Sequence, residues 1–345
     1  MSLWEPLAGL PLEIEDYALE RHERDVSSAF TRVSTTIRLR GGGTDGVGED
    51  VTYDAPDHDR LLEAGASLPL QGTWTLERFC DHLATLDLWP APPEREPSRH
   101  YRVWAYESAA LDLALRQAGK PLHQVLGRTP RPVRYVVSLR LGEPPSLHPL
   151  LSRLEHYPGL QFKLDPTNDW TPEIVEQVAA TGAVESVDFK GQYKGTVVDV
   201  QADPELYRMV LDALPEAWLE DPHDECLHLC PPERVTWDAP IHSVEDILAL
   251  PFEPRMVNVK PSRLGGLRPL LTAYEHCEAR GIRMYGGGQF ELAEGRGQIQ
   301  YLASLFHADG PNDVAPGGFN DNDPPPGLPE SPLEPQTAPT GFRWG

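Results

Sequence analysis

From about residue 131 onward, short apolar runs alternate with segments of helical periodicity. Eight runs have the length of one strand each: Tyr135–Leu139, Leu160–Leu164, Val184–Phe189, Ala217–Leu219, Val235–Trp237, Met256–Val259, Arg283–Tyr285 and Asp313–Ala315. Helices are predicted between most of them, including 267–279, 296–306 and one beginning at Thr171-Pro172, a capping residue before a first-turn proline. This alternation predicts a parallel β/α barrel.

A doubly wound sheet is the structural alternative to a barrel. It would be expected to carry a glycine-rich dinucleotide fingerprint after the first strand, and none follows residue 139. The repeat is least regular from Asp221 to Glu233, because that connection contains proline and has little helical character.

Before residue 131 the pattern mixes strand and helix signals. Residues 34–40 alternate as in a β-strand and lead into a predicted turn at Gly41-Gly42-Gly43, followed by residues 46–51. Residues 102–118 carry apolar side chains at helical spacing and predict a long helix that stops near Gly119. We therefore expect an α/β chain with a smaller α+β region before the barrel.

Composition narrows the possible partners. The 345 residues include 53 acidic and 30 basic side chains, a formal charge of −23, which argues against nucleic acid or an anionic membrane as a partner. No apolar run approaches the roughly 18 residues that a membrane span needs, and the first residues lack a signal-peptide pattern. We expect a cytoplasmic protein. The four cysteines do not suggest a disulfide framework.

Lysine is scarce, with five lysines among the 30 basic residues. Arginine serves wherever positive charge alone is needed, so a retained lysine can mark a need for an amine that loses its proton near neutral pH. Lys163 and Lys260 each end a short apolar run. They form a candidate acid/base pair at two strand ends.

The predicted strands between these lysines end in Asp188, Glu220 and Asp238. In a parallel barrel the C-terminal ends of the strands carry the chemistry. Three converging carboxylates repel one another and make sense mainly around a hard divalent cation such as Mg²⁺. Such a cation would also reverse the local field, so that an acidic protein can bind a small carboxylate.

The arrangement resembles the enolase superfamily, most closely its muconate cycloisomerase-like (mandelate racemase/muconate lactonizing enzyme) branch. The most specific match runs from Val257 through Lys260 to Gly266, and Gly287 to Glu291 resembles the seventh-strand motif. Residues 104–127 are similar to the passage from the capping domain into the barrel. The resemblance covers most of the chain.

The resemblance implies an N-terminal α+β capping domain at 1–130 and a modified TIM barrel of the (β/α)7β type at 131–320. A proline-rich tail at 321–345 is expected to pack back on the capping domain. Relatives of this kind are commonly dimers or larger, so a homo-oligomer is expected.

The same resemblance implies roles for the strand-end residues. Mg²⁺ would be held by Asp188, Glu220 and Asp238, and would stabilise the enediolate formed when the proton α to a substrate carboxylate leaves. Lys163 and Lys260 would address opposite faces of that carbon.

Several positions depart from the family pattern. The second strand reads Gln161-Phe162-Lys163-Leu164-Asp165 where Lys-x-Lys is usual; we align Lys163 with the catalytic lysine, although strand parity also allows Asp165. Lys190 replaces an Asn and either contacts a second anionic group of the substrate or forms a structural ion pair. It could also help depress the pKa of Lys163 or weaken Mg²⁺ binding. Gln289 stands where Met is common, and with Glu291 it is a further candidate for substrate binding.

Other patterns have simpler explanations. The lysines could be ordinary ion-pair partners and each carboxylate a helix cap, but the ordered set favours the ligand interpretation. His223, Cys226, His228 and Cys230 suggest zinc but lack the usual second ligand pair at a distance. Residues 286–288 suggest a phosphate loop but lack the following Gly-Lys-Ser/Thr, so they predict tight packing.

We therefore expect a Mg²⁺-dependent isomerase or lyase of the cycloisomerase, racemase or epimerase type, acting on a small-molecule carboxylate. An acid-sugar dehydratase is one alternative, although no His stands at the sixth or seventh strand end. A non-catalytic binding protein on the same fold is another, motivated by the altered second strand and by Lys190. Capping-domain loops expected near Leu12–Arg24 and Gly41–Asp54 would choose the substrate.

Overall fold

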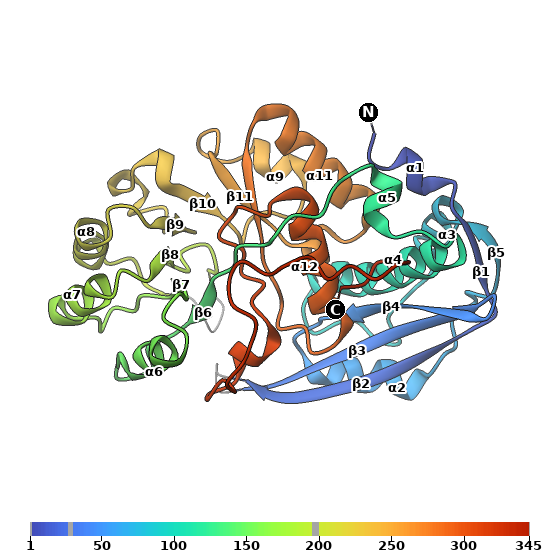
Figure 1. Cartoon of the computed structure of the whole chain (residues 1–345), viewed down its shortest axis with the longest axis horizontal. Helices are drawn as coiled ribbons and strands as arrows, with labels where there is room; N and C mark the ends of the chain where they lie inside the picture. Colours follow the sequence, from blue (N-terminus) through green and yellow to red (C-terminus); the bar gives the residue numbers. More distant parts are fainter. Residues whose placement is uncertain (1, 27–29, 195–199, 345) are drawn as a thin grey trace.

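The computed structural model describes residues 2–26, 30–194 and 200–344. Its main feature is a curled parallel sheet, at the left and top of Figure 1. Within the described residues, seven strands lie side by side in chain order: β6 (Val137–Leu139), β7 (Phe162–Leu164), β8 (Val184–Asp188), β9 (Trp218–Glu220), β10 (Val235–Trp237), β11 (Met256–Val259) and β12 (Arg283–Gly286). The predicted α/β fold with a modified barrel is confirmed.

The predicted eighth strand, Asp313–Ala315, is reduced to isolated bridges. Asn312 pairs with Tyr135 and Asp313 pairs with Gly287, both in parallel. The Asp313 amide donates to the Gly286 carbonyl at 2.8 Å, and the Val136 amide donates to the Asn312 carbonyl at 2.8 Å. These short links connect the last strand of the sheet to the residues that precede its first strand.

Helices lie on the outside of this sheet, as Figure 1 shows for α6, α7 and α8. The helices of the barrel region are α6 (His148–His156), α7 (Pro172–Ala180), α8 (Pro204–Ala213), α9 (Val244–Leu248), α10 (Pro261–Leu264), α11 (Leu267–Arg280) and α12 (Glu294–Phe306). The predicted cap of α7 is present, because the Thr171 hydroxyl accepts from the Ile174 amide. No helix in the described ranges combines the length and the apolar character that crossing a bilayer requires.

The connection between β9 and β10 contains no α-helix. It forms two short 3₁₀ turns, η1 (Leu227–Leu229) and η2 (Pro232–Arg234), and a third, η3 (Gly317–Asn320), follows the barrel. The irregular repeat expected at residues 221–233 is therefore confirmed.

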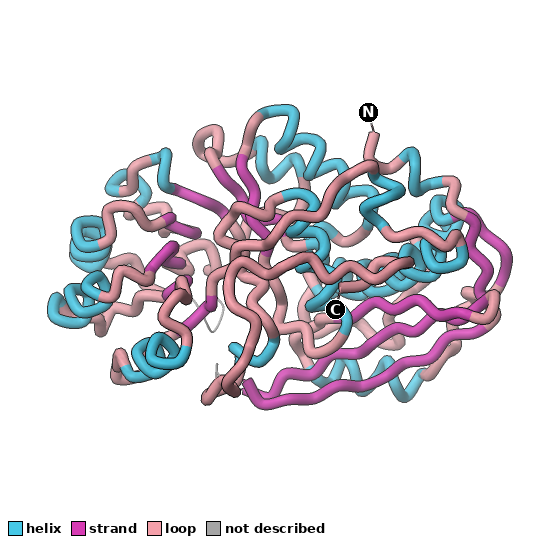
Figure 2. Tube along the Cα trace, in the orientation of Figure 1, coloured by secondary structure: helices cyan, strands magenta, loops and turns pink. Residues whose placement is uncertain are grey.

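The N-terminal region combines two antiparallel sheets with helices. One sheet contains β2 (Asp16–Val26), β3 (Phe30–Gly41) and β4 (Thr44–Asp50), and forms the long ribbon in Figure 2; the other pairs β1 (Pro11–Ile14) with β5 (Gly72–Thr75). The helices are α1 (Glu5–Ala8), α2 (Ala55–Ala64), α3 (Leu76–Leu83), α4 (Ser98–Gln117) and α5 (Leu122–Leu126). The strand, the glycine turn and the long helix predicted here are all present.

The prediction of loops near Leu12–Arg24 and Gly41–Asp54 is wrong. Most of the first segment lies in β1 and β2, and most of the second lies in β4 and the turn before it. β2 was missed because Glu20 to Arg24 are polar at every position, so the sequence shows no alternation there. Its backbone pairing with β3, which runs from Asp16 to Val26, forms the strand instead.

The sheet lies directly on α4. A Cβ at Gly48 would come 2.1 Å from the Ala105 carbonyl oxygen, and one at Gly46 would come 2.3 Å from the Ala109 carbonyl oxygen. Any side chain at these two positions would push β4 off the helix. The two glycines therefore set the distance between the sheet and α4.

Glu49 of β4 joins this sheet to the barrel. Its buried carboxylate accepts hydrogen bonds from the amides of Leu292 (2.6 Å), Ala293 (3.0 Å) and Gly295 (3.0 Å), at the start of α12. The Ser34 hydroxyl donates to it at 2.6 Å. A carboxylate at a helix N-terminus satisfies amides that have no partner within the helix.

The last segment of the chain returns to α4, and the red trace in Figure 1 ends beside that helix. Leu333 pairs with Val133, and Gly341 pairs with Pro121. The Asp112 carboxylate of α4 then accepts from the Phe342 amide at 2.7 Å and from Arg343 Nε at 2.8 Å. This segment therefore contacts both the barrel region and α4.

We expect Glu49→Gln to destabilise the protein by roughly 3 kcal/mol, because the amide nitrogen cannot accept from the buried donors that the carboxylate satisfies. Urea unfolding measures the change. Glu294→Gln is the matched control: this partly exposed residue of α12 lies 3.6 Å from Arg38, and its loss should cost less than about 1 kcal/mol. Equal effects of the two substitutions would contradict the role assigned to Glu49.

Candidate active site

The strand ends bring five of the predicted residues into one buried group. Lys163 lies in β7, Asp188 and Glu220 end β8 and β9, and Asp238 and Lys260 directly follow β10 and β11. Neighbouring parallel strands end at the same edge of a sheet, so these side chains meet there. The three strands that carry carboxylates separate the two that carry lysines.

The closest convergence of carboxylates includes one residue that was not predicted. Asp188, Glu220 and Asp221 each offer an oxygen within 4.8 Å of the others. Asp221 has a φ of 48°, and its two oxygens accept from the amides of Asp238 and Ala239, both at 2.8 Å. It thereby ties the end of β9 to the end of β10. Its position next to Glu220 was the only signal for it in the sequence.

Asp238, the third predicted ligand, contacts cationic and phenolic side chains. Its Oδ2 accepts from Lys260 Nζ at 2.7 Å and from the Tyr193 hydroxyl at 2.9 Å, and its Oδ1 accepts from Arg263 Nη1 at 2.8 Å. Burial alone would raise the pKa of Asp238, but the charges of Arg263 and Lys260 lower it. Arg263 lies within the motif from Val257 to Gly266, but nothing in the sequence indicates a role for it.

Lys163 is surrounded by carboxylates. Its Nζ lies 2.9 Å from Glu220 Oε1, 3.1 Å from Asp313 Oδ2 and 3.8 Å from Asp188 Oδ2. Burial alone would lower the pKa of Lys163, but Glu220, Asp313 and Asp188 raise it well above its usual value. Asp313 belongs to the predicted eighth run but was not singled out.

Lys260 has a different electrostatic environment. Burial lowers its pKa, Asp238 opposes this effect, and the nearby guanidinium of Arg263 lowers the pKa further. The net direction is downward. The two lysines therefore differ, because one faces several carboxylates and the other shares one carboxylate with an arginine.

Lys190 lies directly on Asp188. Its amide donates to Asp188 Oδ1 at 3.0 Å, and its Nζ pairs with Asp188 Oδ2. The same Nζ is 3.6 Å from Asp165 Oδ2, which in turn accepts from Arg140 Nε at 2.9 Å. Asp165 therefore belongs to an ion-pair chain with Lys190 and Arg140, whereas Lys163 reaches the central carboxylates.

The predicted substrate-binding residues Gln289 and Glu291 lie together after β12. Glu291 Oε1 accepts from the Gln289 amide at 2.7 Å, and its Oε2 lies 3.2 Å from Arg296 Nη2. Gln289 is buried, and its Nε2 has no hydrogen-bond partner among the described residues. Arg32 of β3 donates to the Phe290 carbonyl at 3.3 Å, which brings the N-terminal sheet to this turn.

Known proteins resemble this chain in sequence along most of its length. Residues 5–125 match the N-terminal domain, and residues 129–321 the C-terminal domain, of a family described as a domain of unknown function, DUF8230. An N-succinylamino acid racemase from Thermus thermophilus is 28% identical over 320 residues, covering 86% of this chain and 81% of that protein. An o-succinylbenzoate synthase from Geobacillus stearothermophilus is 25% identical over 328 residues, covering 87% and 84%.

Solved structures show the same fold. A dipeptide epimerase from Enterococcus faecalis aligns with a TM-score of 0.68 at 16% identity, covering 96% of this chain and 99% of that one. Muconate lactonizing enzyme from Pseudomonas putida aligns with a TM-score of 0.64 at 19% identity, covering 96% and 97%. This chain belongs to the DUF8230 family. Its fold is that of solved enolase superfamily structures.

Its donor set fits the divalent metal that enolase superfamily members use. Asp188, Glu220 and Asp221 offer only carboxylate oxygens, the ligands that a hard divalent cation prefers. Like charges buried so close together are unfavourable: burial, Asp188 and Asp238 raise the pKa of Asp221 to about 7. A dication would offset this repulsion.

The other metal pattern in this DUF8230 member does not assemble. Among the described residues, Asp188, Glu220 and Asp221 are the one group of three or more metal-binding side chains that converge. Around the His223–Cys230 pattern, which its spacing already disfavours as a zinc site, the sulfur hydrogen bond seen in the described residues runs from Cys230 to the Cys226 carbonyl at 3.8 Å. The zinc interpretation therefore has no support.

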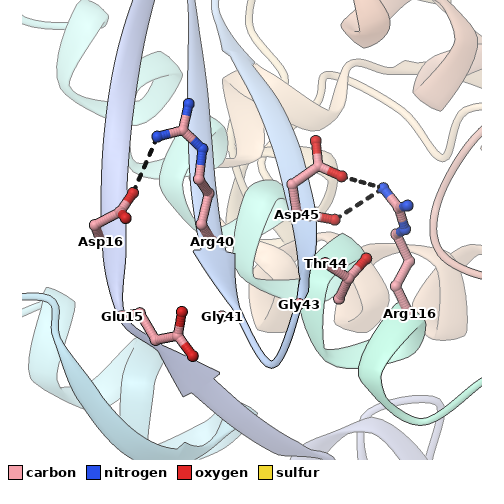
Figure 3. A pocket seen from close by; sticks show the side chains of 8 residues that line it. All are labelled: Glu15, Asp16, Arg40, Gly41, Gly43, Thr44, Asp45 and Arg116. Atoms are coloured by element: carbon pink, nitrogen blue, oxygen red, sulfur yellow. Dashed lines mark hydrogen bonds and ion pairs between the residues drawn. The ribbon is translucent and has the colours of Figure 1, made fainter.

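A surface pocket of about 400 Å³ lies away from these strand ends, where the turn between β3 and β4 meets α4 (Figure 3). Its charged side chains other than Glu15 are already in ion pairs. Arg40 Nη1 lies 3.1 Å from Asp16 Oδ1, and Arg116 Nη1 donates to the Asp45 carbonyl at 2.9 Å. The pocket therefore offers little unpaired charge for a ligand.

Gly287 makes room for Lys260, the candidate catalytic lysine that directly follows β11. A Cβ at this position would lie 2.5 Å from Lys260 Cε and 2.8 Å from Asn258 Nδ2. The tight packing predicted for residues 286–288 is therefore confirmed. The absence of a side chain at Gly287 leaves the space that the extended side chain of Lys260 occupies.

We expect Gly287→Ala to displace Lys260 rather than to unfold the protein, because the clashing atoms belong to side chains that can move. A crystal structure should show Lys260 Nζ farther from Asp238, and urea unfolding should show a cost of only roughly 1 kcal/mol. Gly9→Ala is the control, since nothing lies within 4 Å of its Cβ position. An unmoved Lys260 in Gly287→Ala would refute this account.

Proposed function

We propose that this DUF8230 protein is a racemase or epimerase that moves the proton α to the carboxylate of a small acid. The observation that carries the proposal is the placement of Lys163 and Lys260 on the two sides of three carboxylate-bearing strands. Two amines on opposite sides of one carbon are what inversion at that carbon requires.

The proposed reaction uses one lysine as base and the other as acid. The base takes the α-proton on its nitrogen, the C–H bond breaks, and its electron pair stays on the substrate and spreads into the carboxylate. The second lysine then returns a proton to the opposite face. Burial lowers the pKa of Lys260, which favours its free amine, and the nearby carboxylates raise the pKa of Lys163, which favours its ammonium. In the reverse direction Lys163 would act as the base, because an ion bound to Glu220 and Asp188 would weaken this stabilisation of its ammonium.

We propose Mg²⁺ as the metal, with Asp188, Glu220 and Asp238 as its protein ligands. When bound, the ion would neutralise the charge that builds up on the substrate carboxylate. Asp221 is less suited to the third position because both of its oxygens are fixed on backbone amides. In the described residues, the carboxylate of Asp238 accepts instead from the side chains of Lys260, Tyr193 and Arg263, which can move aside.

N-succinyl amino acids are the substrate class that we propose to test first. The Thermus thermophilus relative is named for this class, and the succinyl group carries a second carboxylate. Lys190 is the cation proposed to meet it, and Gln289 offers an unpartnered buried amide near the same strand ends. Glu291 is proposed as a further substrate contact.

A synthase reaction that yields o-succinylbenzoate is the second candidate. It is favoured by the names of four relatives, which match between 18% and 87% of this chain. Both candidates involve a succinyl group and a carboxylate.

In deuterated buffer with Mg²⁺, we expect the protein to exchange the α-proton of both configurations of N-succinyl amino acids. Lys163→Ala and Lys260→Ala should each slow exchange from a different configuration by at least about 100-fold, because each removes the base for one face. NMR of the α-proton signal measures both rates.

Lys120→Ala, which removes an exposed lysine, is the control and should leave the rates unchanged. No exchange across the panel by Mg²⁺-loaded protein would favour a synthase or a binding protein. Equal losses in both configurations for each lysine variant would contradict the two-face mechanism.

We expect Asp188→Asn and Asp238→Asn to weaken Mg²⁺ binding by roughly 100-fold, because each removes an ionised ligand. Asp221→Asn should weaken it less and mainly lower stability, since its oxygens hold the end of β10. Titration calorimetry gives the affinities, and urea unfolding gives the stabilities. A greater loss of affinity in Asp221→Asn than in Asp238→Asn would make Asp221 the third ligand.

A further inference from the structure

The segment that closes the barrel places one more carboxylate at the site. Asp313 is held on both sides of its backbone: its amide donates to the Gly286 carbonyl at 2.8 Å, and its carbonyl accepts from the Gly288 amide at 3.2 Å. Its partly buried side chain reaches Lys163 Nζ at 3.1 Å. The bridge to Gly287 therefore fixes the position of Asp313 relative to β12.

Asp313 differs from the other carboxylates around Lys163. Glu220 and Asp188, at 2.9 and 3.8 Å from Nζ, are both proposed ligands of the metal ion. Once these two serve a dication, they hold the lysine ammonium less well, and the dication itself repels it. Asp313 lies outside the converging carboxylate group and stays available to Lys163.

Lys260 has no such additional partner. Among the described residues, the one carboxylate within ion-pair distance of its Nζ is Asp238, at 2.7 Å, and this residue is itself a proposed ligand. The two faces of the site are therefore built differently. One lysine is anchored independently of the metal ligands, and the other is not.

We infer that Asp313 is a positioning residue for Lys163, which holds the side-chain nitrogen, as amine or as ammonium, on its own face of the substrate carbon while the ion occupies Asp188 and Glu220. This inference rests on the proposed function. Its consequence is specific to one face: loss of Asp313 impairs the half-reaction of Lys163 and spares that of Lys260. A displacement of about 1 Å in a catalytic group costs on the order of 100-fold in rate.

The experiment measures α-proton exchange from each configuration of an N-succinyl amino acid in deuterated buffer with Mg²⁺. The configuration whose exchange is lost in Lys163→Ala identifies the substrate that gives its proton to Lys163. We expect Asp313→Asn to slow exchange from that configuration by roughly 100-fold, and exchange from the other by less than about 3-fold. Asp313→Glu keeps the charge and should recover part of the rate.

Two further measurements separate positioning from a general structural effect. In the Lys163→Ala background, Asp313→Asn should add no further loss, because residues that act through one another are not additive. The Mg²⁺ affinity of Asp313→Asn, measured by calorimetry, should stay within about 3-fold of the parent value. Asp309→Asn is the matched control, since this exposed carboxylate of the same segment pairs only with Arg131 in the described residues.

The outcomes distinguish this inference from the function on which it rests. Absence of exchange in the parent protein overturns the proposed function itself. Exchange in the parent protein, with equal losses from both configurations in Asp313→Asn, overturns the positioning role and leaves the function standing. An additive loss in the Lys163→Ala background overturns it as well.

Discussion

Buried ion pairs at the strand ends are the constraint on which the site depends. Asp188, Glu220 and Asp238 are fully removed from water, which is costly for a charge unless a partner stands beside it. Each has a lysine in contact: Lys190 with Asp188, Lys163 with Glu220, and Lys260 with Asp238. Breaking one such pair leaves its partner buried and unpaired, so the strand ends and the lysines hold one another in place.

The sequence predicts the barrel well and the N-terminal sheet less well, for one physical reason. Buried strands such as β10 and β11 are short, mostly apolar runs bounded by polar residues, and they are visible without any knowledge of the fold. β2 carries mostly polar side chains over its second half, so it can be recognised as a strand only from its backbone hydrogen bonds to β3. The eighth barrel segment is defined in the same way, by single bridges to Tyr135 and Gly287.

The same reasoning separates the site residues that were found from those that were missed. Lys163, Glu220 and Lys260 stand at the ends of recognisable runs. Asp221 and Asp313 act through contacts between strands that are distant in sequence, and no local pattern marks them. Arg263 was visible within a motif, but its contact with Asp238 becomes apparent only when α10 is placed beside β10.

The scarcity of lysine has a consequence for the chemistry of the whole surface. Lys163 and Lys260 are buried and Lys190 is mostly covered, whereas Lys120 and Lys194 are exposed. Amine-directed reagents, such as acylating labels or aldehyde cross-linkers, therefore meet very few accessible targets on this protein. Slower labelling of Lys163, Lys190 or Lys260 would measure how often these buried amines become exposed to solvent.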